Sequence, residues 1–100
     1  MHLISDNIQK IIALCKKYKV KNLYAFGSVL TPRFNAESDI DLLFNFEPEI
    51  DYNNYADNYF DLKDALVLLF GRDVDLVDEK TLKNPYFIDS VKSTRQLIYG

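Results

Sequence analysis

Apolar residues near the start of the chain follow the spacing of a helix. They recur at steps of three and four positions: Ile8, Ile11, Ile12, Cys15 and Tyr18. This spacing places them along one stripe of a helix and leaves the intervening lysines on the opposite, solvated face. Ser5 can cap the first turn, because its hydroxyl can accept a hydrogen bond from a free backbone N–H. We therefore predict a helix that begins at Ser5 and runs to about Tyr18.

Two short strands are predicted on either side of a Gly-Ser turn. The first covers residues 23–26 and ends at Gly27 and Ser28, where a brief helix over residues 28–30 follows. The second covers residues 40–46, in which apolar and polar side chains alternate as on a strand with one buried face. The apolar members of this alternation, which we expect to pack on helices, are Ile40, Leu42 and Phe44.

The second half of the chain predicts two more helices and one more strand. A long helix is expected over residues 52–70, and its buried stripe would consist of Tyr55, Tyr59, Leu62, Leu66 and Leu69. Gly71 suits the left-handed C-terminal cap of this helix. A strand follows at residues 72–78. Asn84 as N-cap and Pro85 in the first turn then open a closing helix, which we expect to run to the end of the printed sequence.

The predicted order is helix, strand, turn, strand, helix, strand, helix. It indicates an α+β fold in which a small mixed sheet has helices packed on one face. The other face would be open and would present the polar side chains of the strands. We expect residues 1–100 to form a single domain, because 100 residues are enough for one core.

The most informative polar residues are Asp39 and Asp41. Residues i and i+2 of a strand point to the same side, so these two carboxylates would project side by side. Adjacent carboxylates repel each other unless a cation lies between them, and Mg²⁺ favours a few protein carboxylates together with substrate phosphates. A neighbouring strand would bring Asp75, which lies between Val74 and Leu76, beside the pair. The sequence therefore predicts a metal site that handles phosphate.

Gly27 and Ser28 supply a second part of such a site. A turn of this kind offers backbone N–H groups that can hold phosphate, and glycine allows the backbone to approach closely. An Asp-x-Asp pair alone is common at solvated strand ends, and a Gly-Ser pair alone usually marks only a turn. Because both occur here at the borders of strongly apolar runs, their combination favours the functional interpretation.

The pattern Gly-Ser, nine residues, then Ser-Asp-x-Asp, followed by a strand with a third aspartate, resembles the minimal nucleotidyltransferase domain of the DNA polymerase β superfamily. The resemblance covers nearly the whole chain. It implies the polymerase-β-like nucleotidyltransferase fold, two Mg²⁺ ions and a nucleoside triphosphate as donor, with ATP expected. The core motif positions, all present, are Gly27, Ser28, Asp39, Asp41 and Asp75.

The resemblance also implies catalytic and metal-binding roles. Asp39 and Asp41 would bridge the two ions. Asp75 would ligate one of them and help to take the proton from an attacking hydroxyl.

Contacts to the triphosphate are implied for Gly27 and Ser28. Many relatives carry a basic residue and a further glycine soon after this pair, whereas residues 29–34 here read Val-Leu-Thr-Pro-Arg-Phe. Arg33 is therefore our candidate for the positive charge that holds the nucleotide.

Stand-alone domains of this kind often occur beside a small helical partner of the HEPN type, in toxin–antitoxin pairs. The resemblance implies an antitoxin that adds AMP to a tyrosine of its toxic partner, and this protein AMPylation is the function that we expect. Two alternatives stay open: nucleotidylation of a small hydroxylated molecule, and a module that neutralises a partner by contact alone. The exposed aromatic candidates for a contact surface are Tyr52, Phe60 and Tyr86.

Charge, cysteine content and hydropathy bear on the class of partner and on the compartment. The formal net charge of −3 argues against general nucleic-acid binding, because nucleic-acid-binding domains usually display a basic patch. Cys15 is the only cysteine and cannot form an internal disulfide, which fits a reducing compartment. No apolar run is long enough to span a membrane, and the chain begins without a signal-peptide pattern. We therefore expect a cytoplasmic protein, and no pattern specifies its oligomeric state.

Overall fold

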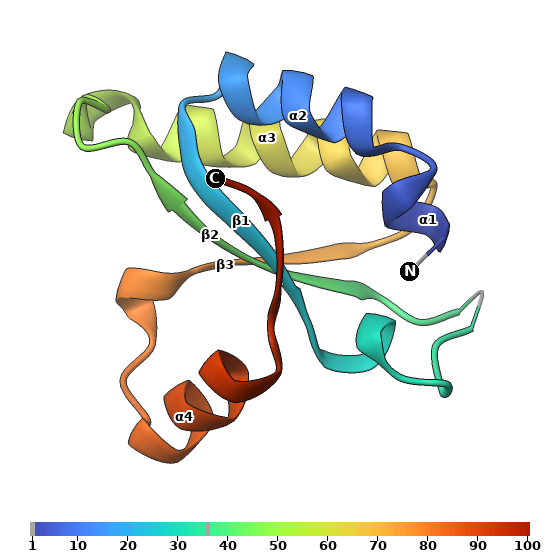
Figure 1. The fold of residues 1–100 in the computed structure, drawn as a ribbon. Helices are drawn as coiled ribbons and strands as arrows, with labels where there is room; N and C mark the ends of the chain where they lie inside the picture. Colours follow the sequence, from blue (N-terminus) through green and yellow to red (C-terminus); the bar gives the residue numbers. More distant parts are fainter. Residues whose placement is uncertain (1, 36) are drawn as a thin grey trace.

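The computed structural model describes residues 2–35 and 37–100. Within these residues, a four-stranded sheet lies between helices (Figure 1). The strands are β1 (Val20–Phe26), β2 (Ile40–Phe46), β3 (Val74–Asp78) and β4 (Gln96–Tyr99). The helices are α1 (His2–Ser5), α2 (Ile8–Lys17), α3 (Tyr55–Phe70) and α4 (Pro85–Thr94). Short 3₁₀ helices also occur: η1 (Gly27–Leu30), η2 (Tyr52–Asn54) and η3 (Glu79–Thr81).

The strands lie across the sheet in the order β3-β2-β1-β4. β1 pairs antiparallel with β2 and with β4, whereas β2 and β3 are parallel. A parallel pair needs a long crossover connection, and α3 supplies it between β2 and β3. The predicted α+β fold with a small mixed sheet is therefore confirmed.

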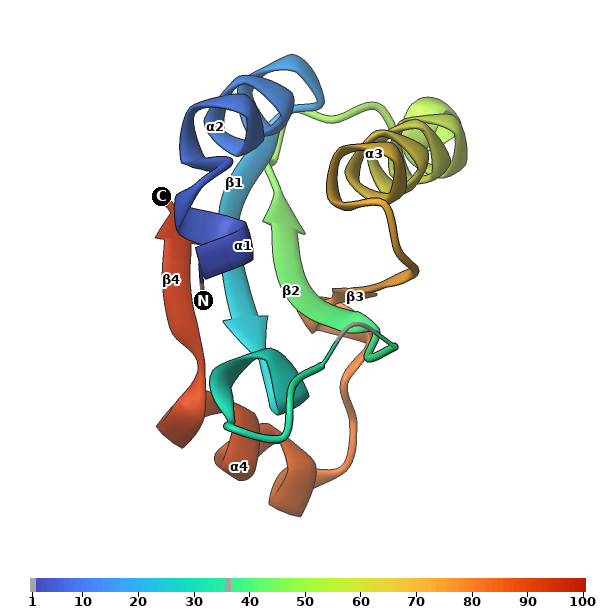
Figure 2. The same ribbon diagram turned by 90° about the vertical axis from the view of Figure 1, so that its right-hand side faces the viewer.

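The main core lies between the sheet and the pair of helices α2 and α3, which cover one face (Figure 2). Its buried members include Ile11, Cys15, Leu62 and Leu66 from the helices and Ile40, Leu42 and Phe44 from β2. These residues come from the apolar stripes that the sequence predicts. Burial raises the pKa of the Cys15 thiol to about 12, so this cysteine is a small core residue and not a reactive thiol.

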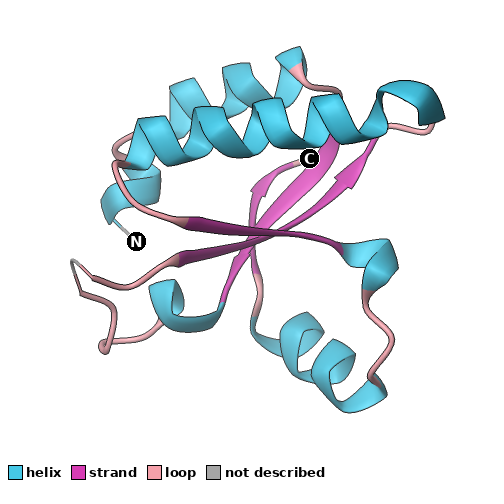
Figure 3. Cartoon of the chain, turned by 180° about the vertical axis from the view of Figure 1, so that it is seen from behind, coloured by secondary structure: helices cyan, strands magenta, loops and turns pink. Residues whose placement is uncertain are grey.

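α4 lies on the opposite side of the sheet from α2 and α3 (Figures 1 and 3). Val91 of this helix packs there with Phe26 and Leu43 in a second, smaller apolar cluster. The ring of Phe87 also meets Phe26 edge-on, with ring centroids 6.2 Å apart. The predicted packing of helices on one face is thus correct for α2 and α3, and the structure adds α4 over part of the far face.

The prediction of a helix that runs to the end of the sequence is wrong. α4 ends at Thr94, Arg95 adopts an extended backbone, and β4 pairs with β1. Without β4, β1 would be an edge strand with a row of unpaired backbone groups. Long-range pairing therefore decides the conformation of this short apolar segment, which is too brief for periodicity to separate strand from helix.

The starts of several elements also differ from the predictions: β3 begins at Val74 and not at residue 72, and η1 begins at Gly27 and not at residue 28. Ser5 ends α1 and does not cap the longer helix, because the chain turns before Asn7, which takes the N-cap position without a side-chain hydrogen bond. Residues 52–54 form η2, so α3 begins at Tyr55. β1 already begins at Val20.

Both predicted helix caps are confirmed. Gly71 has a φ of +67° and ends α3 in the left-handed conformation that glycine adopts without strain. The side chain of Asn84 accepts hydrogen bonds from the backbone N–H groups of Tyr86 and Phe87, and Pro85 opens the first turn of α4. None of the helices in the described part of the chain is long and apolar enough to cross a membrane.

Candidate active site

The parallel pairing of β2 with β3 aligns Asp41 with Asp75. Their Cα atoms are partners in the ladder, one step after the pair formed by the buried residues Ile40 and Val74. Because side chains alternate along a strand, the two carboxylates lie side by side on the face that points away from α2 and α3. Asp39 directly precedes β2. The structure therefore brings the third aspartate beside the Asp-x-Asp pair, as the sequence predicts.

Gly27 lies against Asp41 from the other side. It follows Phe26, whose Cα is the partner of Asp41 in the antiparallel ladder of β1 and β2. A Cβ at position 27 would lie 2.4 Å from Oδ2 of Asp41, and the φ of Gly27 is +74°. Both the close approach and the positive φ require glycine here, so the Gly-Ser turn is built around the Asp41 carboxylate.

The pKa of Asp41 is raised above its usual value. Burial of the carboxyl group is the largest cause, and the negative charges of Asp75 and, more weakly, Asp39 act in the same direction. The backbone N–H of Ser28 donates a hydrogen bond to the carboxylate and opposes the shift. The ionised form of Asp41 is therefore disfavoured by its neighbours, as expected where carboxylates are grouped to receive a cation.

The donor set fits Mg²⁺. Asp39, Asp41 and Asp75 offer hard carboxylate oxygens. The sheet holds the backbones of Asp41 and Asp75 next to each other, and Asp39 directly precedes β2. No three His, Cys, Asp or Glu side chains among the described residues are close enough together to form a finished metal site. The side chains would therefore have to turn toward one another to bind an ion, and Asp41 would have to move from its bond with Ser28.

A hollow of about 310 Å³ opens beside two of these carboxylates. It is lined by Asp39, Lys63, Val67, Asp73, Val74 and Asp75. Lys63 of α3 is the one basic residue of this lining and forms no ion pair within the described part of the chain. Sequence reasoning did not identify it, because a lysine on a helix usually points to solvent. The available signal was its position four residues after Tyr59, at the margin of the buried stripe.

Arg72 holds the segment that precedes Asp39. Its Nη1 donates hydrogen bonds to the backbone oxygens of Asn35 (2.8 Å) and Ser38 (3.2 Å). Its guanidinium lies over the ring of Phe34, 4.8 Å from the ring centroid. The hydroxyl of Ser38 also accepts from the backbone N–H of Asn35. Arg72, which the sequence analysis did not identify, therefore fixes the turn from which Asp39 emerges.

The contacts that Ser28 and Arg33 are predicted to make with the nucleotide stay predictions. The backbone N–H of Ser28 is bonded to Asp41 in this structure, so it would have to exchange this partner for a phosphate oxygen. Arg33 is exposed, and its backbone oxygen accepts from Asn35. Within the described residues, the side chain of Arg33 forms no hydrogen bond or ion pair, so it is free to meet a ligand.

Comparisons of sequence agree with this geometry. The family model described as polymerase beta, nucleotidyltransferase, matches residues 9–100. Two proteins of Methanocaldococcus jannaschii, both provisionally named protein adenylyltransferases, are each 39% identical to the chain. One match spans 97 residues, which is 96% of this chain and 93% of the relative. The other match spans 85 residues, which is 83% of this chain and 79% of the relative.

Comparisons of structure give similar folds. A solved structure provisionally described as a minimal nucleotidyltransferase has a TM-score of 0.77 and 28% identity, over 96% of this chain and 95% of that one. A chain from a toxin–antitoxin complex with AMP-PNP has a TM-score of 0.71 and 26% identity, and the match covers 94% of this chain and 73% of that one. A chain from the complex of an AMPylated Shewanella oneidensis HEPN toxin with an MNT antitoxin has a TM-score of 0.65, and the match covers 96% of this chain and 71% of that one. At 24% identity, this likeness shows the shared fold.

Proposed function

The chain belongs to the polymerase beta nucleotidyltransferase family, and from this premise we propose that it transfers AMP from ATP to a hydroxyl group of a partner protein. The observation that carries the proposal is the alignment of Asp41 with Asp75 directly beside Gly27. This arrangement supports the proposal because it puts acidic side chains, which would serve as ligands of a cation, next to a turn that contains glycine. In this proposal residues 1–100 act as one catalytic domain.

The nucleotide and its metal would be held by residues of both parts of the site. Asp39, Asp41 and Asp75 are the ligands proposed for two Mg²⁺ ions. Bound Mg²⁺ neutralises the charge of the triphosphate and lowers the pKa of a coordinated hydroxyl. The N–H of Ser28 would hold a phosphate oxygen once it is released from Asp41, and the exposed Arg33 would supply a positive charge to the same group.

The transfer step forms one bond and breaks another. The acceptor oxygen attacks the α-phosphorus of ATP, the bond from this phosphorus to the oxygen that bridges to the β-phosphate breaks, and pyrophosphate leaves with the electron pair. Asp75 is exposed on its strand and accepts the proton that the acceptor hydroxyl loses. Asp41 is too enclosed by Gly27 and Ser28 to meet an acceptor directly, so its role is that of a metal ligand.

The acceptor that we propose is a tyrosine of a HEPN-type toxin, which would make the chain an antitoxin. Support comes from the relatives provisionally named protein adenylyltransferases and from the similar fold in a complex of an AMPylated HEPN toxin with an MNT antitoxin. The toxin–antitoxin complex with AMP-PNP supports an adenine nucleotide as the donor. The open hollow beside Asp75 is consistent with an acceptor that arrives on a second protein.

Transfer of a label from ATP tagged on its α-phosphate tests the proposal. The purified chain would be mixed with Mg²⁺ and host lysate, and labelled proteins would be identified by mass spectrometry. Asp39→Asn removes a proposed ligand, and Asp64→Asn is the matched control, because Asp64 is an exposed carboxylate on α3 outside the hollow.

We expect one labelled protein band with the wild type and with Asp64→Asn, and none with Asp39→Asn. A label that survives Asp39→Asn would contradict the assigned site. If the wild type labels no protein but modifies a small hydroxylated compound, the protein acceptor is wrong and the chemistry is retained. If neither is labelled while the chain still neutralises its partner, it acts by contact alone.

A further inference from the structure

The two edges of the sheet differ in how they are protected. An edge strand presents a row of unpaired backbone N–H and C=O groups, which can pair with another extended chain unless charges or covering groups prevent it. β3 forms one edge of the described sheet, and β4 forms the other. A comparison of these two strands therefore shows where the sheet can accept a further strand.

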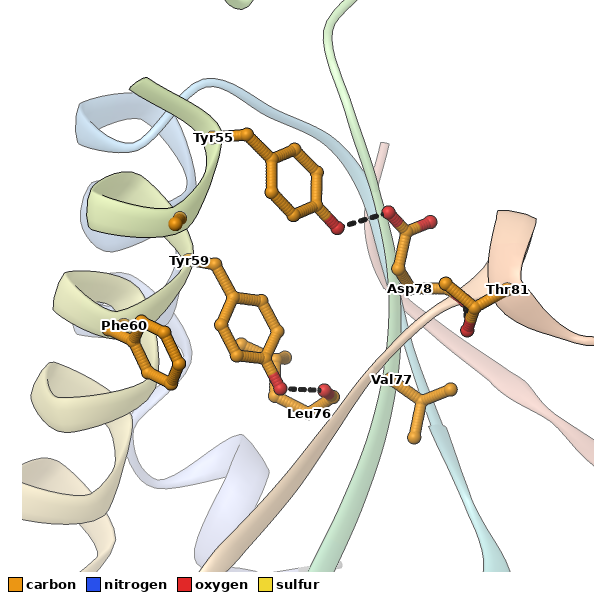
Figure 4. A pocket seen from close by; sticks show the side chains of 8 residues that line it. Tyr55, Tyr59, Phe60, Leu76, Val77, Asp78 and Thr81 are labelled. Atoms are coloured by element: carbon orange, nitrogen blue, oxygen red, sulfur yellow. Dashed lines mark hydrogen bonds between the residues drawn. The ribbon is translucent and has the colours of Figure 1, made fainter. Parts of the chain in front are cut away.

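β3 is protected along its edge. The hydroxyl of Tyr59 donates a hydrogen bond to the backbone oxygen of Leu76 (Figure 4), and the hydroxyl of Thr81 donates one to that of Asp78. The strand also carries the carboxylates of Asp75 and Asp78. An added strand would need the carbonyl groups that these hydroxyls occupy, so β3 is a poor template for strand addition.

β4 has neither kind of protection. Its four residues carry no charge, and no tyrosine or threonine hydroxyl among the described residues donates a hydrogen bond to its backbone. The side chain of Leu97 is 56% exposed, and its Cα is the partner of Tyr24 in the ladder of β1 and β4. A strand added beside β4 would cover Leu97 with its own side chains. β4 is therefore the edge at which the sheet can be extended.

Charge is distributed unevenly between the two edges. Nine of the twelve Lys and Arg residues lie within residues 1–22 and 79–100, the segments that contribute α2, the start of β1, α4 and β4. Twelve of the fifteen Asp and Glu residues lie within residues 23–78, which contribute α3 and β3. The elements around β4 are therefore basic, although the whole chain has a formal net charge of −3.

Some of the charges next to β4 are already balanced. Arg95, which directly precedes the strand, forms an ion pair with Glu79. Near the other end of β4, a hollow that includes Tyr99 is lined by two lysines and two glutamates: Lys16, Lys19, Glu47 and Glu49. These groups do not select the charge of a partner.

Lys21 and Lys92 are the unbalanced charges at the two ends of β4. Lys92 lies in the last turn of α4, before the strand begins, and the backbone of Lys21 lies beside Gly100, where the strand has ended. Both lysines are exposed, and neither forms an ion pair within the described part of the chain. Figure 2 shows β4 at the outer edge of the sheet, with α4 at its start and α2 toward its end.

Backbone chemistry and charge together select the occupant of this edge. The free backbone groups of β4 require an extended segment, and a strand of four residues forms few bonds, so charges at its ends matter for binding. A second copy of β4 would bring Lys21 or Lys92 of one copy beside a lysine of the other, whichever way the strands ran. β3 of a second copy is acidic, but its carbonyl groups are occupied. A strand of another protein with acidic ends meets both requirements.

We propose that the β4 edge binds a strand of a partner protein: an extended segment with apolar residues at its centre and acidic residues at its ends. The segment pairs with the backbone of β4, covers Leu97 and places its carboxylates beside Lys21 and Lys92. β3, which carries Asp75, lies three strand spacings away, or roughly 14 Å. The inference thus goes beyond the proposed function, because it assigns a contact surface that takes no part in the transfer of AMP.

A fluorescent peptide of sequence Asp-Glu-Val-Thr-Val-Thr-Val-Glu-Asp is the probe, and fluorescence anisotropy with the full chain measures its Kd. One comparison peptide has lysines at both ends in place of the acidic residues. Another keeps the acidic ends but carries methyl groups on the backbone nitrogens of all its central residues, so it cannot pair as a strand.

Charge reversal in the chain supplies the matched variants. Lys21→Glu with Lys92→Glu reverses the proposed contacts. Lys80→Glu with Lys83→Glu changes the net charge equally, at two exposed lysines in η3 and between η3 and α4. Asp75→Asn tests independence from the candidate active site.

We expect the acidic peptide to bind the wild type, the Lys80 and Lys83 variant and Asp75→Asn with equal Kd, and reversal of Lys21 and Lys92 to raise the Kd about tenfold. The lysine-ended and methylated peptides should bind at least tenfold more weakly than the acidic peptide. Equal binding of the methylated peptide would show attraction of charge without strand pairing, and equal binding of the lysine-ended peptide would show no selection of charge. Either result overturns the proposal.

Absence of binding by the acidic peptide also overturns it. Light scattering then identifies the reason: a dimer would show that a second copy occupies the edge, and a monomer would show that the edge accepts no strand. All these outcomes are distinguishable from failure of the proposed function, because that function is measured by label transfer and not by peptide binding.

Discussion

Gly27 leaves free the space that the carboxylate of Asp41 occupies. A Cβ on residue 27 would lie 2.4 Å from Oδ2 of Asp41, which is closer than non-bonded atoms can approach. This contact joins the end of β1 to the start of β2, the two positions that the Gly-Ser and Asp-x-Asp motifs mark in the sequence.

Gly27→Ala should abolish most of the activity. The new Cβ would displace the carboxylate of Asp41, and a misplaced ligand should lower the rate of AMP transfer roughly a hundredfold or more. Gly71→Ala is the matched control, because Gly71 has a similar φ of +67° but no atom within 4 Å of the added Cβ. Both variants should lose about 1–2 kcal/mol of stability from the positive φ, measured by urea unfolding. Equal activity of the two variants would show that the contact with Asp41 has no catalytic importance.

Asp41→Asn should raise the Tm of the metal-free protein at pH 7. The folded state raises the pKa of Asp41, so stability is present below the pKa of the unfolded chain and is lost as the pH rises through the folded value. Asparagine cannot ionise and avoids this loss, which we expect to be worth about 2–5 °C in a differential scanning measurement. Mg²⁺ with ATP should raise the Tm of the wild type and have little effect on the variant. An equal ligand-induced shift in both proteins would argue against Asp41 as a metal ligand.

Glu79 should stabilise the fold at neutral pH and not in acid. It accepts hydrogen bonds from Asn45 and Arg95, both at 2.6 Å. Burial raises its pKa, but these bonds and the charge of Arg95 outweigh burial and lower the pKa overall. Stability from Glu79 is therefore present above the unfolded pKa of about 4.3 and is lost as the pH falls through the folded value.

Urea unfolding of Glu79→Gln measures this contribution. We expect a loss of about 1 kcal/mol at pH 7 that shrinks toward zero near pH 3. Glu49→Gln is the control, because Glu49 is exposed. If Glu79→Gln lowers the free energy of unfolding as much in acid as at pH 7, then packing, and not the charge of Glu79, is responsible for the loss.

Arg72→Ala should impair the metal site without unfolding the protein. Arg72 bonds to the backbone of the segment before Asp39, so its loss should let this ligand move. We expect kcat to fall about tenfold and the Mg²⁺ concentration for half-maximal activity to rise. Arg72→Lys should restore little, since lysine lacks the planar group that stacks on Phe34.

Arg33→Ala separates positioning from nucleotide binding. Its guanidinium is exposed on the same segment, so we expect a raised KM for ATP and an unchanged requirement for Mg²⁺. If Arg72→Ala needs no more Mg²⁺ than Arg33→Ala does, Arg72 has no role in positioning Asp39.

Local patterns in the sequence predict much of the fold. The alternation of residues 40–46 gives both the strand and the face on which Asp41 lies, and the caps at Gly71 and Asn84 follow from residue type alone. β4 could not be predicted in the same way, because residues 96–99 form a strand only through pairing with β1. The break before Asn7 also lies between Ile4 and Ile8, which are spaced four positions apart as in one helix, so periodicity alone does not reveal it.

The residues of the candidate site likewise fall into two groups: those that local sequence patterns predict and those whose positions depend on packing. Asp39, Asp41 and Gly27 belong to compact motifs, and the strand that carries Asp75 has a readable alternation. Lys63 and Arg72 could not be assigned, because their positions depend on how α3 and the segment before β2 pack against β3.

The catalytic rate of Asp75→Asn, compared with that of Asp73→Asn, tests the central claim most directly. Both residues line the same hollow, so the two variants remove the same charge from nearly the same place. Single-turnover transfer from α-labelled ATP should be roughly a thousandfold slower with Asp75→Asn, because a metal ligand and a proton acceptor are lost together. Asp73→Asn should stay within about threefold of the wild type, as expected for an exposed carboxylate outside the metal site. Equal rates for the two variants, whether both fast or both slow, would contradict the assignment of Asp75 as a catalytic residue.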